Sequence, residues 1–190
     1  GSKVLAICNT QGSTIPREAD AALYTYAGPE IAVASTKAFL TQVVACFLVG
    51  LYLAQVRGNK YGDEIAAIVD ELADMPSKVD LVLDTTDGVR ELAREFSNAR
   101  SVLFIGRHVG FPVALEGALK LKELAYMHAE GFAAGELKHG PIALLEDGMP
   151  VVVIEAAQLG CTGYETPEEL NANAALKARL EIIRLAAGAR

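Results

Sequence analysis

Short apolar runs alternate with stretches of helical spacing along this chain, and that alternation restricts the fold more than any other feature. The strand-like runs are residues 3–8 (KVLAIC), 101–105 (SVLFI) and 150–154 (PVVVI), with a weaker one at 21–26 (AALYTY). Long helices are expected between them, at residues 36–57 and 112–127. Strands that alternate with helices favour parallel pairing with helices on both faces. We therefore predict an α/β fold with a parallel sheet flanked by helices.

The helical stretches carry start and stop signals. Ser35 is expected to be the N-cap of the helix over residues 36–57, which should end at Gly58. Apolar residues then recur from position 65 to 72 with one-sided helical spacing. Pro76 should end or kink that helix, and further stripes follow it. Residues 59–98 are therefore predicted to form a helical connector.

The C-terminal segment carries a local helix signal of its own. Thr166 is placed as an N-cap, Pro167 as the first helical residue, and Glu169 three positions after the cap, which is a capping box. We expect an extra C-terminal helix from there to about Ala187.

Charge and composition exclude several classes of partner. A net charge of -7 and a pI near 5.0 leave no basic field for nucleic acid or for an anionic membrane surface. The most apolar stretch, residues 43–54, is shorter than the roughly 20 residues that cross a bilayer, and it is interpreted as a buried helix. No secretory signal opens the chain.

The cysteines point to a reducing compartment. Cys8, Cys46 and Cys161 are too few and too scattered for a disulfide framework. No CxxC pair or His/Cys cluster has metal-ligand spacing. We expect a cytoplasmic protein that holds neither a metal nor a cofactor.

Three charged residues share one face of the helix at 112–127. Glu116, Lys120 and Glu123 lie at positions i, i+4 and i+7. A Glu followed four residues later by Lys is also the favoured orientation for an ordinary helical ion pair, which adds only about 0.2–0.5 kcal/mol. Spacing therefore leaves open both a catalytic group and a surface pair.

Residues 128–141 (HAEGFAAGELKHGP) combine two His, two Glu and a Lys among glycines, which is unusual for a plain loop. Glycine lets the backbone approach a ligand closely. His139 is a candidate general acid or base because its unperturbed pKa, near 6.5, lies close to working pH. The alternative is an ordinary surface histidine.

These motifs resemble a known enzyme family. Residues 32–39 (AVASTKAF), 114–123 (ALEGALKLKE) and 128–141 resemble, in order, the isomerase region of the glutamine–fructose-6-phosphate aminotransferase family, whose members make glucosamine 6-phosphate. The resemblance implies an SIS-like (sugar isomerase) fold, which is a three-layer arrangement like that of flavodoxin and Rossmann domains. The fold would be incomplete in this chain. Residues 1–58 would be the C-terminal part of a first sugar isomerase subdomain, and residues 99–157 the N-terminal half of a second. Residues 59–98 would be the helical connector between them, and residues 158–190 an unmatched helical tail.

The resemblance also implies roles for single residues. Glu123 would be the base that moves a proton between C1 and C2 of the sugar, with Lys120 assisting beside it. His139 would assist ring opening across a subunit boundary, in a homo-oligomer expected to be a dimer. Ser35 and the backbone around Val33 would touch the substrate, a sugar phosphate of the fructose 6-phosphate class.

The family pattern is not matched everywhere. The phosphate-gripping pattern SxSGxT does not occur; residues 10–14 (TQGST) resemble it superficially, but they match another family segment and no following helix is expected. The family's C-terminal lysine segment and its glutaminase domain with an N-terminal cysteine are not found either. After about residue 157 the sequence faintly resembles PrpF-like isomerases. Two hypotheses follow: an impaired isomerase fragment, or a catalytically inactive chimeric module that self-associates.

Overall fold

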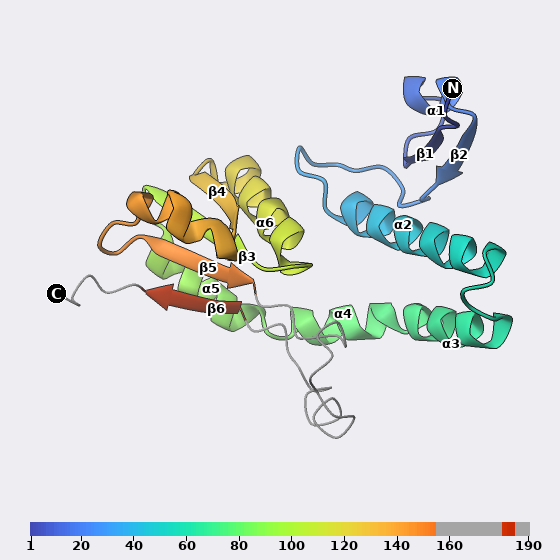
Figure 1. The fold of residues 1–190 in the computed structure, drawn as a ribbon. Helices are drawn as coiled ribbons and strands as arrows, with labels where there is room; N and C mark the ends of the chain where they lie inside the picture. Colours follow the sequence, from blue (N-terminus) through green and yellow to red (C-terminus); the bar gives the residue numbers. More distant parts are fainter. Residues whose placement is uncertain (155–179, 185–190) are drawn as a thin grey trace. The chain divides into compact units, whose positions relative to one another are not determined.

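Two separate sheets organise the chain, one in each of two compact units, Gly1–Val89 and Arg90–Arg190. The computed structural model describes residues 1–154 and 180–184 (Figure 1). Both units combine helices with parallel strands, so the predicted α/β class is confirmed. The division between the units falls within the predicted connector. The assignment of residues 1–58, 99–157 and 158–190 to parts of two subdomains and a tail stays a prediction.

The first unit opens with a two-stranded parallel sheet. Strand β1 (Leu5–Cys8) pairs with β2 (Ala21–Tyr24), so that Leu5 lies opposite Ala21. Both predicted strands are therefore confirmed, although each is shorter than expected. The five-residue helix α1 (Thr14–Glu18) connects them and begins at the last residue of the TQGST stretch, where no helix was expected. That expectation was wrong, but a helix this short offers only about one turn of backbone N–H groups.

Helix α2 (Lys37–Val56) is one residue shorter at each end than the predicted helix over residues 36–57. Its C-cap is Arg57, and Gly58 follows with φ +70°, the left-handed conformation that glycine adopts without strain. The N-cap residue is Thr36, so the prediction of Ser35 as N-cap was wrong. Ser35 precedes the cap by one residue, and the side chain of Glu30 supplies the acceptors at this helix end.

The exposure of α2 departs from the sequence prediction. Only 11% of its most apolar 18-residue window is buried, and Phe47 and Tyr52 are 48% and 65% exposed. The prediction of a buried helix is thus wrong within the described residues, because β1 and α3 are its main contacts and leave most of its surface uncovered. Helix α2 is also long and apolar enough to cross a membrane, judged by length and composition alone. Core helices of soluble proteins meet the same two criteria.

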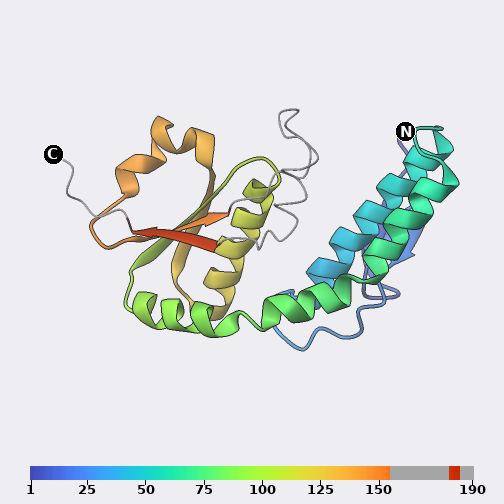
Figure 2. The same cartoon turned by 90° about the horizontal axis from the view of Figure 1, so that it is seen from below.

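Three helices follow α2, as the sequence predicted. They are α3 (Gly62–Ala73), α4 (Met75–Leu83) and α5 (Thr86–Phe96). Pro76 lies in the first turn of α4, where its missing N–H costs nothing, and it separates α3 from α4 as expected. Helices α2 and α3 lie side by side (Figure 2).

The second unit is built on a four-stranded sheet. Its strands are β3 (Ser101–Gly106), β4 (His128–Ala133), β5 (Pro150–Ile154) and β6 (Leu180–Arg184), in the order β4-β3-β5-β6. Strand β3 is parallel to both β4 and β5. Helix α6 (Gly110–Ala125) packs on β4 and β3, and the core between them includes Val102, which is 4% exposed, Ala114 and Ala129.

Two strands of this sheet were not predicted. Residues 128–133 were treated as a loop but form β4, followed by the short 3₁₀ helices η1 (Ala134–His139) and η2 (Pro141–Leu144). Glycine inside β4 lets α6 approach closely, since a Cβ at Gly131 would lie 3.0 Å from Cα of Leu115 on α6. The glycine that made this stretch look like a loop therefore permits close packing of helix on strand.

The predicted C-terminal helix was wrong where it can be checked. Residues 180–184 form β6, which pairs antiparallel with β5 and places Ile182 opposite Val152. Ile182 and Ile183 are β-branched and favour a strand, and pairing with β5 outweighs the local helix signal. Thr166, Pro167 and Glu169 lie outside the described residues.

Candidate functional site

The three charged residues predicted to share a helix face are in contact on α6. Nζ of Lys120 lies 2.7 Å from Oε2 of Glu123 and 3.1 Å from Oε1 of Glu116. The three side chains are only 21–26% exposed, so each is partly screened from water. The spacing of i, i+4 and i+7 thus produces one partly buried cluster with two carboxylates and one ammonium.

The cluster holds its ammonium in the charged form. The hydrogen bond to Glu123 raises the pKa of Lys120 above its ordinary value. Desolvation opposes this effect, and the hydrogen bond to Glu116 adds a smaller one in the raising direction. Lys120 therefore stays protonated at neutral pH and offers a fixed positive charge beside Glu123. A carboxylate that passes a proton between adjacent carbons benefits from such a neighbour, because the intermediate carries developing negative charge.

His139 lies at the end of η1 and pairs with another carboxylate. Its Nδ1 lies 2.8 Å from Oε2 of Glu136, three residues earlier, and the His139 side chain is 60% exposed. Glu136 was not singled out from the sequence as a partner, although the i, i+3 spacing on a helical turn would have indicated it. The pairing orients the imidazole, and within the described residues no contact engages its Nε2.

Glu123 and His139 lie near opposite ends of strand β4 in one chain. Helix α6 runs from the end of β3 back to the start of β4, so Glu123, in its last turn, lies near the amino end of β4. His139 follows the carboxyl end of the same strand. Among the described contacts, none joins these two residues, and the structure of one chain does not bring them together.

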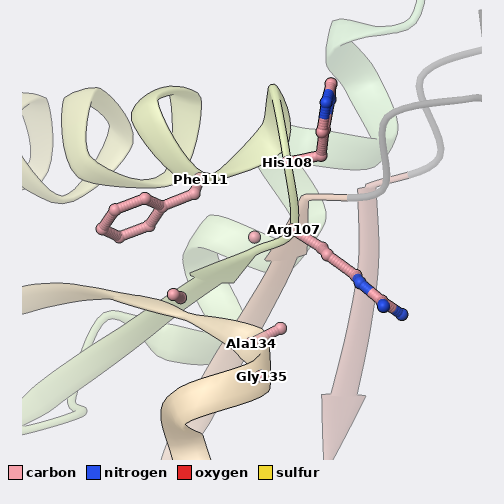
Figure 3. Close-up of a pocket in the computed structure, with 7 residues that line it drawn as sticks. Arg107, His108, Phe111, Ala134 and Gly135 are labelled. Atoms are coloured by element: carbon pink, nitrogen blue, oxygen red, sulfur yellow. The ribbon is translucent and has the colours of Figure 1, made fainter. Parts of the chain in front are cut away.

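A cavity of about 540 Å³ lies at the carboxyl ends of β3 and β4. Its lining comes from the end of β3, the start of α6 and the loop between them, and from the end of β4 and the start of η1: Gly106, Arg107, His108, Phe111, Ala133, Ala134 and Gly135. Figure 3 shows that Arg107 and His108 extend from the loop in different directions. Glu123, Lys120 and His139 are not part of this lining, so this cavity is separate from the charged cluster on α6.

The two predicted sugar contacts belong to the first unit. Val33 and Ser35 lie in the loop between β2 and α2, where Val33 is 91% exposed and Ser35 is half-buried. Ala34 between them is fully buried and anchors the loop. The exposed backbone around Val33 is therefore accessible to a ligand, as the predicted role requires.

The model of the SIS domain family matches residues 1–51 and 95–179, which is more than half of the chain. The chain belongs to the SIS domain family. The match reaches residue 179, past the position near 157 at which the sequence resemblance was expected to end. The SIS-like fold predicted from the motifs is confirmed.

Curated relatives show which type of SIS protein this chain is similar to. It is 67% identical over 160 residues to glutamine–fructose-6-phosphate aminotransferase (isomerizing) of Corynebacterium glutamicum, and 70% identical over 160 residues to that of Streptomyces coelicolor. In both cases the match covers 84% of this chain and 26% of the relative. The SIS chain therefore spans about a quarter of the length of these curated relatives.

A solved structure supports the same placement. The C-terminal domain of glucosamine-fructose-6-phosphate aminotransferase from Francisella tularensis superposes with a TM-score of 0.76 and 41% identity. The superposition covers 82% of this SIS chain and 44% of that one. The chain thus corresponds to part of the isomerase region of this type of enzyme.

Proposed function

We propose that this chain carries part of a sugar-phosphate isomerase site that acts on fructose 6-phosphate. The observation that supports this most directly is the Glu116–Lys120–Glu123 cluster, since it places a partly buried carboxylate 2.7 Å from an ammonium that is charged at neutral pH. Sequence identity of 67–70% to glutamine–fructose-6-phosphate aminotransferases supports the substrate class. In this proposal Glu123 moves the proton between C1 and C2, and Lys120 stabilises the oxyanion that forms.

The role of His139 requires a second copy of the chain. His139 assists ring opening in the site of a neighbouring subunit, because within one chain it lies near the opposite end of β4 from Glu123. Ser35 and the backbone around Val33 contact the sugar. We propose a cytoplasmic homodimer, in keeping with relatives that are metabolic enzymes by name.

The isolated chain should bind its substrate weakly. No SxSGxT pattern occurs within residues 1–190, and a phosphate held by backbone N–H groups at a helix start provides much of the grip in sites of this kind. Isothermal titration should therefore give an affinity for fructose 6-phosphate no tighter than about 1 mM, about 4 kcal/mol of binding free energy. Micromolar binding would contradict the proposal of an impaired site.

Turnover is the second test of the proposed function. Any conversion of fructose 6-phosphate to glucose 6-phosphate should disappear in Glu123→Gln, which keeps the size of the side chain and removes the base. Lys122→Gln on the same helix is a matched control, since Lys122 is not part of the charged cluster. Turnover that persists in Glu123→Gln would show that Glu123 is not the base.

The exposed surface of α2 favours a second candidate, an inactive module that self-associates. Leu40, Val43 and Leu53 on this helix are each more than half exposed, as are Tyr52 and Val56. Apolar patches of this kind seek partners. In this alternative the charged cluster of α6 is a relic of the family, and residues 158–190 are a chimeric tail.

A further inference from the structure

We infer that Glu30 is a positioning residue for the loop that carries Val33 and Ser35. The inference rests on the proposed function, which assigns the sugar contacts to these two residues. Glu30 was not among the residues singled out from the sequence. Its side chain lies at the start of the loop, and its hydrogen bonds are made at the end of the loop.

The carboxylate of Glu30 joins the two ends of the loop through two hydrogen bonds, which together are called the Glu30 clasp. Oε1 accepts a hydrogen bond from the hydroxyl of Thr36 at 2.9 Å, and Oε2 accepts one from the backbone N–H of Ala38 at 3.1 Å. These partners lie six and eight residues further along the chain. The hydrogen bonds therefore fix the distance between the two ends of residues 30–38, which include both proposed sugar contacts.

The geometry also satisfies the start of α2. Thr36 is the N-cap residue but makes no capping hydrogen bond with its own side chain, and Ala38 is the second residue of the helix. A carboxylate that accepts from an early helical N–H is favoured by charge as well as by hydrogen bonding, because the amino end of a helix is partly positive. The bond to Ala38 is the main reason that the pKa of Glu30 is lowered.

The beginning of the loop is held independently by Asn9. Its Oδ1 accepts from the backbone N–H of Ala27 at 2.8 Å and from the hydroxyl of Thr25 at 3.1 Å. Its Nδ2 donates to the carbonyl oxygen of Gly28 at 2.6 Å. Asn9 thus fixes the chain before the loop, and Glu30 ties the start of the loop to its end. Buried Ala34 holds the middle of the loop.

The consequence concerns Val33 and Ser35, which flank Ala34. Side chains at 31 and 33 are more than 90% exposed, so they contribute almost no packing that would hold this backbone in place. The loop conformation depends instead on buried Ala34 and on the polar anchors at its two ends. Loss of the Glu30 carboxylate should therefore release the backbone around Val33 without disturbing the β1–β2 sheet.

The test is a titration with fructose 6-phosphate, followed through the backbone amide signals of the isotopically labelled full chain. The wild type should show saturable shifts at Val33 and Ser35. Glu30→Ala should weaken the apparent affinity by about tenfold, the effect expected when a hydrogen bond to a charged group is lost. Glu30→Gln keeps an acceptor for Ala38 and should stay within about threefold of the wild type. Glu18→Ala, at an exposed acid of the first unit, should leave the affinity unchanged.

The outcomes separate the two claims. No saturable shift in the wild type would overturn the proposed function, and this inference with it. Saturable shifts in the wild type with the same affinity in Glu30→Ala would overturn the inference alone. If Glu30→Ala loses the dispersed amide signals of β1 and β2, Thr36→Val takes its place: an affinity about threefold weaker supports the inference, and an unchanged one overturns it.

Discussion

The ammonium group of Lys120 donates a hydrogen bond of 2.7 Å to the carboxylate of Glu123, one turn further along α6. The same ammonium lies 3.1 Å from Glu116, so one positive charge is shared by two carboxylates. All three side chains are mostly covered, which distinguishes the cluster from the solvated ion pairs that carry little energy.

The first prediction concerns alkaline pH. The pKa of Lys120 is raised above its ordinary value of 10.5, so its contribution to stability is complete below about 10.5 and is lost as the pH rises through the higher folded-state pKa. Lys120→Met should therefore be less stable than the wild type at neutral pH, by a difference that shrinks in strong alkali. Urea unfolding of both proteins between about pH 8 and 12 measures this, and a constant difference would contradict it.

The second prediction concerns acid pH and Glu30. Its pKa is lowered from 4.5, chiefly by the hydrogen bond from Ala38, so the clasp contributes fully above about 4.5 and is lost as the pH falls through the lower folded-state pKa. Lys37, the charged neighbour at the start of α2, adds to the effect. Carboxyl carbon shifts should show Glu30 titrating below 4.5, and the Ala38 amide should lose protection over the same range. Titration at or above 4.5 would show that the clasp is absent in solution.

The third prediction concerns the turn between β3 and α6. A Cβ at Gly106 would lie 2.2 Å from the carbonyl oxygen of Gly110, and backbone must move to relieve that contact. Gly106→Ala should cost about 1–3 kcal/mol in the free energy of unfolding. Gly88→Ala is the matched control, because Gly88 lies within α5 with open space around it and alanine there should stabilise by up to about 1 kcal/mol. Equal unfolding midpoints for both variants would contradict the close approach.

The fourth prediction concerns the apolar surface of α2. Light scattering should show an apparent mass that rises with concentration in the wild type, because α2 exposes large apolar side chains over most of its length. Phe47→Lys, at a residue 48% exposed, should reduce that rise, whereas Ile142→Lys, at one 52% exposed in η2, should not. A wild type that stays monomeric at high concentration would argue against both self-association and the proposed homodimer.

The sequence predicted those parts of the fold whose signal is local. Strands at 101–105 and 150–154 are continuous apolar runs, and they form the centre of the second sheet as β3 and β5. Helical spacing also predicted that Glu116, Lys120 and Glu123 would meet on one face, because three residues at i, i+4 and i+7 lie within two turns of each other.

The missed features depend on partners that are distant in the sequence. Strand β4 contains Gly131, which weakens any local strand signal and has its reason only in the approach of α6. Strand β6 forms against β5 despite a capping box upstream that favours a helix. Glu30 reaches Thr36 and Ala38 across a loop, a spacing that no helical or strand period predicts. Relations of this kind follow from tertiary structure and not from local pattern.

The most direct test of the central claim is a crystal structure of the chain with fructose 6-phosphate bound. We expect the carboxylate of Glu123 within hydrogen-bonding reach of the C1 and C2 substituents, about 2.6–3.2 Å between heavy atoms, and the imidazole of His139 from a second copy in the same cavity. Sugar bound only in the pocket beside Arg107 and Phe111, with Glu123 and His139 sharing no cavity in any assembly, would contradict the proposed site.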